Sequence, residues 1–198
     1  MEKYIIASLN EAKASLTSFI KDDKNIAAIQ KAAEIAIITL ENKNTIYSCG
    51  NGGSMSDAIH FAEELTGKYR KNRAGLAAAA ISDPGHISCV ANDFGYEYIF
   101  SRYLEARAKK GDSLLAISTS GQSKNVIQAA QYAKEHGISI ISLTGTSGSE
   151  LGKISTVDIC TLAGFYADRV QELHIKVIHI LIELIERKFF PANYDNLL

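Results

Sequence analysis

Five short apolar runs, separated by segments with helical spacing, constrain the fold of this chain more than any other feature. The runs cover residues 45–49, 76–81, 113–118, 139–143 and 157–162, and the second is weak as a strand because it is mostly alanine. Continuous apolar strands that alternate with helices are typical of a parallel sheet with both faces covered. The sequence therefore predicts an α/β fold around a five-stranded parallel sheet.

Apolar residues recur at helical spacing in two opening segments, 2–21 and 24–41. Further helices are expected at about 54–68, 94–110, 123–136 and 166–188. His86 is expected in a loop, with Asn92 and Asp93 at the start of the 94–110 helix. The residues after Arg187 are expected to fray or to pack on a neighbour. A length of 198 residues favours one domain, here 1–198, divided into a helical pair (1–43), an α/β core (44–188) and a tail (189–198).

Composition excludes several classes of protein. The formal net charge is −1 and no basic block exists, which argues against charge-driven nucleic-acid binding. No run of about 18 uncharged apolar residues exists, so no membrane span is expected, and the charged N-terminal helix does not resemble a signal peptide. Three widely spaced cysteines predict neither a disulfide framework nor a zinc ribbon, and they fit a reducing cytoplasm.

Two predicted strands end in polar loops that contain glycine, at 50–54 and 118–123. Each loop should lead into a helix, whose free N–H groups and partial positive charge attract an anion. Helix capping alone explains one such loop. The hydroxyls of Ser118, Thr119, Ser120 and Ser123 together favour a phosphate site. The loop at 144–148 is more typical of a turn and a helix cap.

Two helices carry candidate catalytic or metal-binding groups. His60 and Glu64 share a helix face, and the spacing does not exclude Glu63. An exposed hydrogen-bonded pair is the simpler explanation, but the pair follows an anion loop by about two turns. On the last helix, Asp168, Gln171, Glu172, His174 and His179 interrupt a long apolar pattern, and the spacing does not choose between His174 and His179.

These residues together resemble the phosphoheptose isomerase family of the sugar isomerase (SIS) superfamily. The matching segments are 49–54, 57–58, 60–65, 92–95, 118–121 and 168–172 with His174. The resemblance extends from the paired N-terminal helices to about Arg187.

The resemblance implies a flavodoxin-like three-layer α/β/α sandwich and a homotetramer that uses residues 1–43 for assembly, with active sites between subunits. It implies conversion of D-sedoheptulose 7-phosphate to D-glycero-D-manno-heptose 7-phosphate, the first step towards activated heptose for lipopolysaccharide or surface glycans. It implies one zinc ion per subunit, and it selects His179 over His174. The matching metal ligands are His60, Glu64, Gln171 and His179. The matching substrate contacts are Asn51, Gly52, Gly53, Glu64, Asn92, Asp93, Ser118, Thr119, Ser120, Ser123 and Gln171.

An aldose–ketose isomerisation removes a proton beside a carbonyl and returns it to the neighbouring carbon through an enediol. Glu64 is the candidate base and His179 the candidate acid. Zinc ligation would make both groups poorer proton carriers, so either the ligation is labile or Asp168 moves protons instead.

Two other classes of function compete with this hypothesis. A non-catalytic tetramer that binds a replication-initiator protein would not need all four candidate ligands. A sugar-phosphate-sensing regulator would need a DNA-binding domain, for which the chain offers only its two opening helices.

Overall fold

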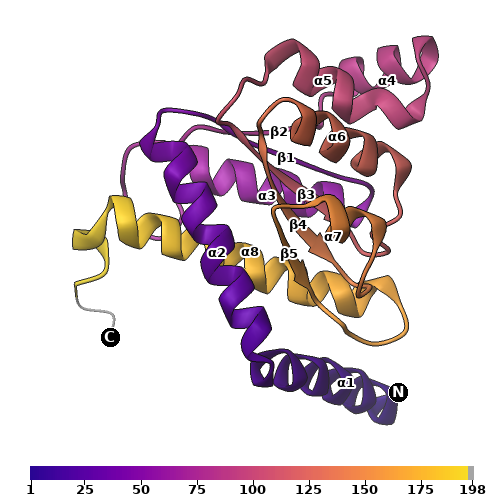
Figure 1. The fold of residues 1–198 in the computed structure, drawn as a ribbon. Coiled ribbons are helices and arrows are strands. Elements are labelled where there is room, and N and C mark those ends of the chain that lie inside the picture. The colour runs from indigo at the N-terminus through magenta and orange to yellow at the C-terminus, as the bar shows by residue number, and fades with distance from the viewer. Residues whose placement is uncertain (196–198) are drawn as a thin grey trace.

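The computed structural model describes residues 1–195 and has three layers, with helices on both faces of one parallel sheet (Figure 1). The sheet has the strand order β2-β1-β3-β4-β5, and every neighbouring pair is parallel. The strands are β1 (Ile46–Gly50), β2 (Ala78–Ala80), β3 (Ser113–Ser118), β4 (Ser139–Thr144) and β5 (Val157–Cys160). The predicted flavodoxin-like α/β/α sandwich with two N-terminal helices is therefore confirmed.

Each face of the sheet has its own apolar core. Three helices cover one face: α2 (Asp23–Glu41), α3 (Gly53–Thr66) and α8 (Ala167–Phe189). Four helices cover the other: α4 (Pro84–Asp93), α5 (Ile99–Arg107), α6 (Lys124–Glu135) and α7 (Glu150–Ile154). Side chains of β3 alternate between the two cores, with Leu115 on the α8 side and Leu114 on the α6 side. Burial on both faces explains why the strands contain few charges.

The first helix, α1 (Glu2–Lys21), projects away from the sandwich (Figure 1). Only Phe19 of this helix is buried, while Tyr4, Ile5, Ile6 and Leu9 are each more than half exposed. An amphipathic helix with an uncovered apolar side is typical of a protein–protein contact.

The segment between β2 and β3 differs from the prediction. A helix, α4, spans Pro84–Asp93, so His86 is helical, and the Asp83 carboxylate caps this helix by accepting from the His86 N–H. Asn92 and Asp93 end a helix instead of beginning one. The predicted helix at 94–110 is shorter because Gly95 has φ +106°, and a 3₁₀ turn at Tyr96–Tyr98 precedes α5.

The C-terminal segment also differs from the prediction. Within the described residues it does not fray and it packs on its own chain: α8 continues to Phe189, a 3₁₀ turn follows at Pro191–Asn193, and Tyr194 is buried. The last part of the predicted tail, 196–198, lies outside the described residues. Within residues 1–195, no helix has both the length and the apolarity to cross a membrane.

Candidate functional site

The two predicted anion loops lie side by side at the carboxyl edge of the sheet. The first follows β1 at Gly50 and the second follows β3 at Ser118, and these two strands are neighbours. The chain connects β1 to β2 across one face through α3 and β3 to β4 across the other through α6. The strand order therefore reverses between β1 and β3, which is where ligands bind in sheets of this type.

A pair of side-chain amides connects the first loop to α6. Asn51 and Asn125 exchange two side-chain hydrogen bonds, at 2.9 and 2.8 Å, and the Tyr96 hydroxyl donates to Asn51 Oδ1 at 3.2 Å. Asn92 and Asp93, four and three residues before Tyr96, are exposed at the end of α4 and are linked to each other at 2.7 Å. The 3₁₀ turn that follows them therefore contacts Asn51, and Asn92 and Asp93 lie at the end of the helix that precedes this turn.

The second loop offers hydroxyls and a free helix start. Ser118 Oγ and Ser123 Oγ are 2.9 Å apart, and the Ser123 side chain does not cap α6. The Val126 N–H donates to Asn125 Oδ1 at 3.0 Å, so the first two amides of the helix, those of Lys124 and Asn125, are the ones that an anion could bind. A hollow of about 280 Å³ adjoins this point, lined by Asn51, Tyr96, Glu97, Ser123, Lys124 and Asn125.

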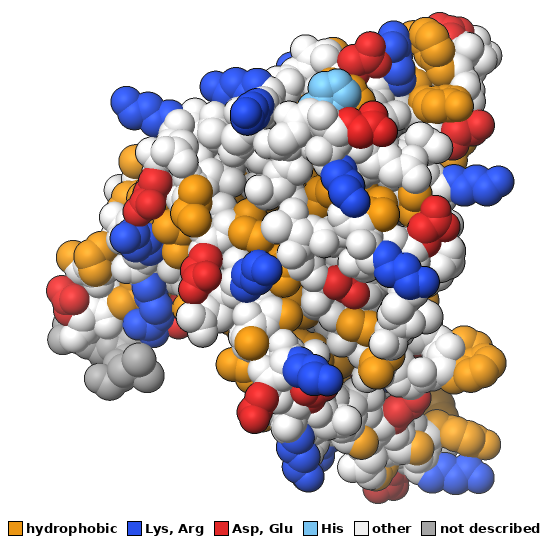
Figure 2. All heavy atoms as spheres, viewed as in Figure 1, with side chains coloured by type: hydrophobic (Ala, Val, Ile, Leu, Met, Phe, Trp, Pro, Cys, Tyr) orange, Lys and Arg blue, Asp and Glu red, His pale blue; other side chains and the backbone are white. Residues whose placement is uncertain are grey.

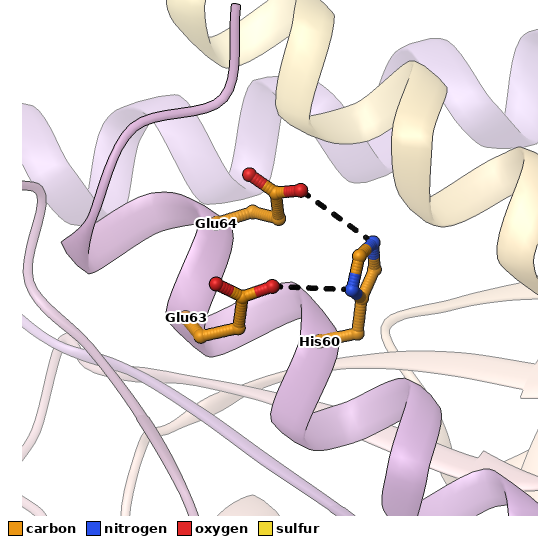
Figure 3. Close-up of side chains that lie close together, drawn as sticks. All are labelled: His60, Glu63 and Glu64. Atoms are coloured by element: carbon orange, nitrogen blue, oxygen red, sulfur yellow. Dashed lines mark ion pairs between the residues drawn. The ribbon is translucent and has the colours of Figure 1, made fainter. Parts of the chain in front are cut away.

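His60 lies at the centre of a second group of polar side chains, about two turns along α3 (Figure 3). Its Nδ1 is 3.2 Å from a Glu63 oxygen, and its Nε2 is 3.7 Å from a Glu64 oxygen and 2.9 Å from His179 Nε2. The structure thus brings together three of the four predicted metal ligands, two on α3 and one on α8.

Glu63, which spacing alone did not exclude, explains the orientation of the His60 ring. The Glu63 carboxylate lies 3.2 Å from Nδ1, and Nε2 faces His179 and Glu64. Metal-binding histidines have the same arrangement, with the second ring nitrogen bonded to a carboxylate.

Burial shifts the protonation of the neighbouring groups. Burial, reinforced by the negative charge of Glu63, raises the pKa of the Glu64 carboxyl. Burial also lowers the pKa of His179, with further contributions from His60, Lys176 and Arg70. The imidazole of His179 is therefore favoured in its neutral, ligating form.

Asp57, one turn before His60 on α3, is a candidate that the sequence pattern did not single out for a role. One of its carboxylate oxygens is buried and has no hydrogen-bond partner, and burial raises its pKa to about 6. The signal was available in the spacing, because residues 57, 60 and 64 share one helix face.

Gln171 connects the two parts of the site. A Cβ on residue 53 would lie 2.6 Å from Gln171 Nε2, so the amide packs directly against Gly53 at the start of α3. Gln171 lies on the helix that also carries His179, two turns closer to the first loop. In this arrangement its amide contacts the loop and forms no hydrogen bond with the His60–His179 pair.

Two other candidates on α8 lie away from this group. Asp168 is exposed and pairs with Arg169. It lies 11 residues before His179, or about 16 Å along the helix. His174 is fully buried, and its Nε2 bonds the Thr144 carbonyl of β4. It faces the sheet and not α3, which is the distinction that spacing could not make.

The donor set fits a divalent metal of the zinc type. The Nε2 atoms of His60 and His179 face each other at hydrogen-bond distance. The carboxylates of Glu64 and Glu63 both lie close to His60. Imidazole and carboxylate are the groups that zinc takes from proteins, and catalytic zinc sites keep a position open for substrate.

Comparison with known proteins identifies the family to which this geometry belongs. A family model described as the SIS domain matches residues 9–145. The phosphoheptose isomerase of Salmonella paratyphi B is 57% identical over 180 residues, which is 91% of this chain and 94% of that protein. This chain belongs to the phosphoheptose isomerase family.

Solved structures of the family superpose closely on this fold. The phosphoheptose isomerase of Neisseria gonorrhoeae has a TM-score of 0.86 at 33% identity, covering 93% of this chain and 98% of that one. A phosphoheptose isomerase from Francisella tularensis has a TM-score of 0.88 at 28% identity, covering 93% and 97%. The family named by the sequence resemblance is therefore confirmed.

Proposed function

We propose that this protein is a sugar-phosphate isomerase that converts D-sedoheptulose 7-phosphate to D-glycero-D-manno-heptose 7-phosphate. The observation that carries the proposal is the placement of two sites on one helix. The first loop leads into α3, with the serine loop beside it at the start of α6, and the His60–Glu64–His179 group lies about 10 Å further along α3. An extended seven-carbon ketose phosphate can place its phosphate at the loops and its reacting carbons at the histidines.

The substrate contacts follow from this placement. The serine loop and the first turn of α6 would bind the phosphate, and residues of the first loop and of the Tyr96 segment would bind the sugar hydroxyls. The proposed set is Asn51, Gly52, Gly53, Glu64, Asn92, Asp93, Ser118, Thr119, Ser120, Ser123 and Gln171. Hydroxyls and backbone amides supply this site without a positive charge on the loop.

Glu64 is the proposed base and His179 the proposed acid. Glu64 would take the proton from C1 of the ketose and return it to C2, and His179 would move a proton between the two oxygens of the enediol. The raised pKa of the partly buried Glu64 carboxyl brings its basicity closer to that needed near neutral pH. His60, Glu64, Gln171 and His179 would hold one zinc ion per subunit, which when bound polarises a carbonyl oxygen and stabilises developing negative charge.

The assembly, the location and the pathway step are proposed with the function. The exposed apolar side of α1 supports a homotetramer, with active sites between subunits and residues 1–43 at the contacts. Residues 44–188 form the proposed catalytic core of the single domain 1–198, and 189–198 form its tail.

Cys49, Cys89 and Cys160 are unpaired thiols, which supports a reducing cytoplasm. The product would begin the route to activated heptose for lipopolysaccharide or surface glycans.

Neither competing class receives support. The relatives reported above are named as isomerases, and nothing in their names points to a replication-initiator scaffold. Figure 2 shows basic and acidic side chains intermingled on the visible face, without a basic stripe that would fit nucleic acid.

The deciding experiment incubates the purified protein with sedoheptulose 7-phosphate, with and without a metal chelator. We expect the heptose aldose phosphate to form, activity to fall after chelation and zinc to restore it. No aldose product in either condition would contradict the proposed function, and product formation that chelation leaves unchanged would contradict the metal.

Glu64→Gln separates the base from the metal. The amide retains an oxygen that can bind a metal but cannot accept the substrate proton, so we expect kcat to fall by about 10²-fold or more with zinc retained. Near-normal turnover with zinc bound would show that another group is the base.

A further inference from the structure

A buried arginine connects the site helix to the C-terminal segment of the chain. Arg73 lies in the loop between α3 and β2, and its side chain is 1% exposed. Its Nε donates to Glu186 Oε1 at 2.6 Å, and the Glu186 side chain, on α8, is fully buried. The Tyr194 hydroxyl donates to the other Glu186 oxygen at 2.8 Å.

The remaining nitrogens of this guanidinium cap the end of α3. Nη2 donates to the Glu64 carbonyl at 2.6 Å, and Nη1 donates to the carbonyls of Leu65 and Gly67, each at 2.7 Å. The last carbonyls of a helix have no partner within the helix, and a cation there also interacts favourably with the helix dipole. Arg73 thus bonds directly to the backbone of the proposed base.

The C-terminal segment holds the same loop at a second point. The Tyr194 ring lies between two arginines, with Arg187 Cζ at 4.4 Å and Arg70 Cζ at 5.7 Å from its centroid. Both arginines bind Glu183, at 2.9 and 2.7 Å. After α8 the chain turns back (Figure 1), so the residues that follow the helix fasten α8 to the loop that follows α3.

Stability alone is a weak explanation for such a pair. Removing two charges from water costs so much that apolar residues of similar volume often stabilise a core as well as a buried ion pair does. What the ion pair adds is geometry, because a planar guanidinium fixes several acceptors in direction as well as distance. Here the acceptors fixed are on α8 and in the last turn of α3, on the two helices whose side chains meet at His60 and His179.

We propose that Arg73 is a positioning residue for the isomerase site. Held by Glu186, and through Glu186 by Tyr194, it fixes the last turn of α3 and thereby the place of the Glu64 carboxylate relative to His60 and His179. The catalytic side of this proposal rests on the proposed function, whereas the ligand geometry does not.

Arg73→Lys tests the proposal, because an ammonium can pair with Glu186 but cannot also reach the three carbonyls. We expect kcat to fall about tenfold, KM to change by less than about twofold, and zinc affinity, measured by competition with a chromogenic chelator, to weaken about tenfold. Tyr194→Phe, which removes one hydroxyl, should shift both quantities less and in the same direction. Arg187→Lys is the matched control, since Arg187 touches Tyr194 and Glu183 but not α3, and we expect no change.

A triple variant separates positioning from stability. Arg73→Met with Glu186→Met and Tyr194→Phe leaves no buried charge unpaired, so we expect urea unfolding close to that of the wild type. We expect kcat and zinc affinity to stay low, because Glu64 has lost its backbone donor. A triple variant with wild-type kcat and zinc affinity would overturn the proposal. If the wild type fails to isomerise the sugar, the proposed function fails, but the zinc comparison still decides the role of Arg73.

Discussion

At the scale of single residues, Glu63 is predicted to act through His60 and not on the substrate. Its carboxylate, 58% exposed, lies 3.2 Å from His60 Nδ1, where its charge would orient the ring. Glu63→Gln keeps an acceptor oxygen but removes the charge, so we expect zinc affinity to weaken about tenfold with KM for the sugar phosphate nearly unchanged. Chelator competition measures the first quantity and steady-state kinetics the second.

The matched control for Glu63 is Glu172→Gln on α8. Glu172 is also exposed and is paired with an arginine, Arg169, away from the histidine pair. We expect the zinc affinity of the Glu172→Gln variant to equal that of the wild type. A rise in KM for Glu63→Gln without a change in zinc affinity would instead mean that Glu63 contacts the sugar.

The sequence predicts residue chemistry better than residue partners. His60 and Glu64 share a face by spacing alone, and the structure places their side chains close together. Spacing could not show that His179 faces α3 while His174 faces the sheet, because that depends on how α8 rotates onto its neighbours. No sequence pattern indicates a role for Arg73. Its contacts are with the end of α3 and, through Glu186, with the C-terminal segment, and these come together only in the folded chain.

At the scale of elements, His174 makes the packing of α8 on β4 sensitive to acid. Burial lowers the pKa of His174 to about 4, and its hydrogen bond to the Thr144 carbonyl offsets only part of that shift. The unfolded chain therefore binds this proton more readily than the folded one, so stability is full above about pH 6.5 and is lost as the pH falls towards 4. The lost contribution is about 3 kcal/mol.

The measurement compares urea unfolding of the wild type and His174→Leu at pH 7 and pH 4.5. The substitution removes the titrating group, so its destabilising effect should be smaller at pH 4.5 than at pH 7. An equal effect at both pH values would show that His174 does not titrate as its burial implies. The comparison isolates His174 from Asp57, whose raised pKa changes stability with pH in the opposite direction.

Elements were predictable where apolar periodicity decides them. Strands β1, β3, β4 and β5 lie within two residues of their predicted limits, because a strand buried on both faces must be apolar throughout. The helix at 84–93 was missed, although Asp83 followed by Pro84 is a recognisable helix start. Its short, mixed sequence gives a weak helical period, and Gly95, at φ +106°, delays the start of the next α-helix to Ile99.

At the scale of the whole molecule, α1 is held to the body by few contacts. Arg169 at the start of α8 donates to Ser8 Oγ at 2.7 Å and pairs with Glu11 at 3.3 Å, while the apolar residues beyond them are exposed. The apolar periodicity of residues 2–21 predicts that α1 is an amphipathic helix. The sequence pattern does not show what covers the apolar side of α1, because a contact between chains depends on two surfaces and the pattern describes only one.

A second copy of the chain is the predicted partner of α1. Ile5→Asp with Leu9→Asp places charges on its exposed apolar side, so a tetramer that uses this surface should dissociate into smaller, folded species. Light scattering measures the mass, and circular dichroism checks that the fold persists, as expected when only Phe19 of α1 is buried. If the active sites lie between subunits, kcat should fall with the mass. Lys134→Glu, on α6 across the sheet, is the control and should change neither the mass nor kcat. An Ile5→Asp, Leu9→Asp variant that stays tetrameric would place the contact elsewhere.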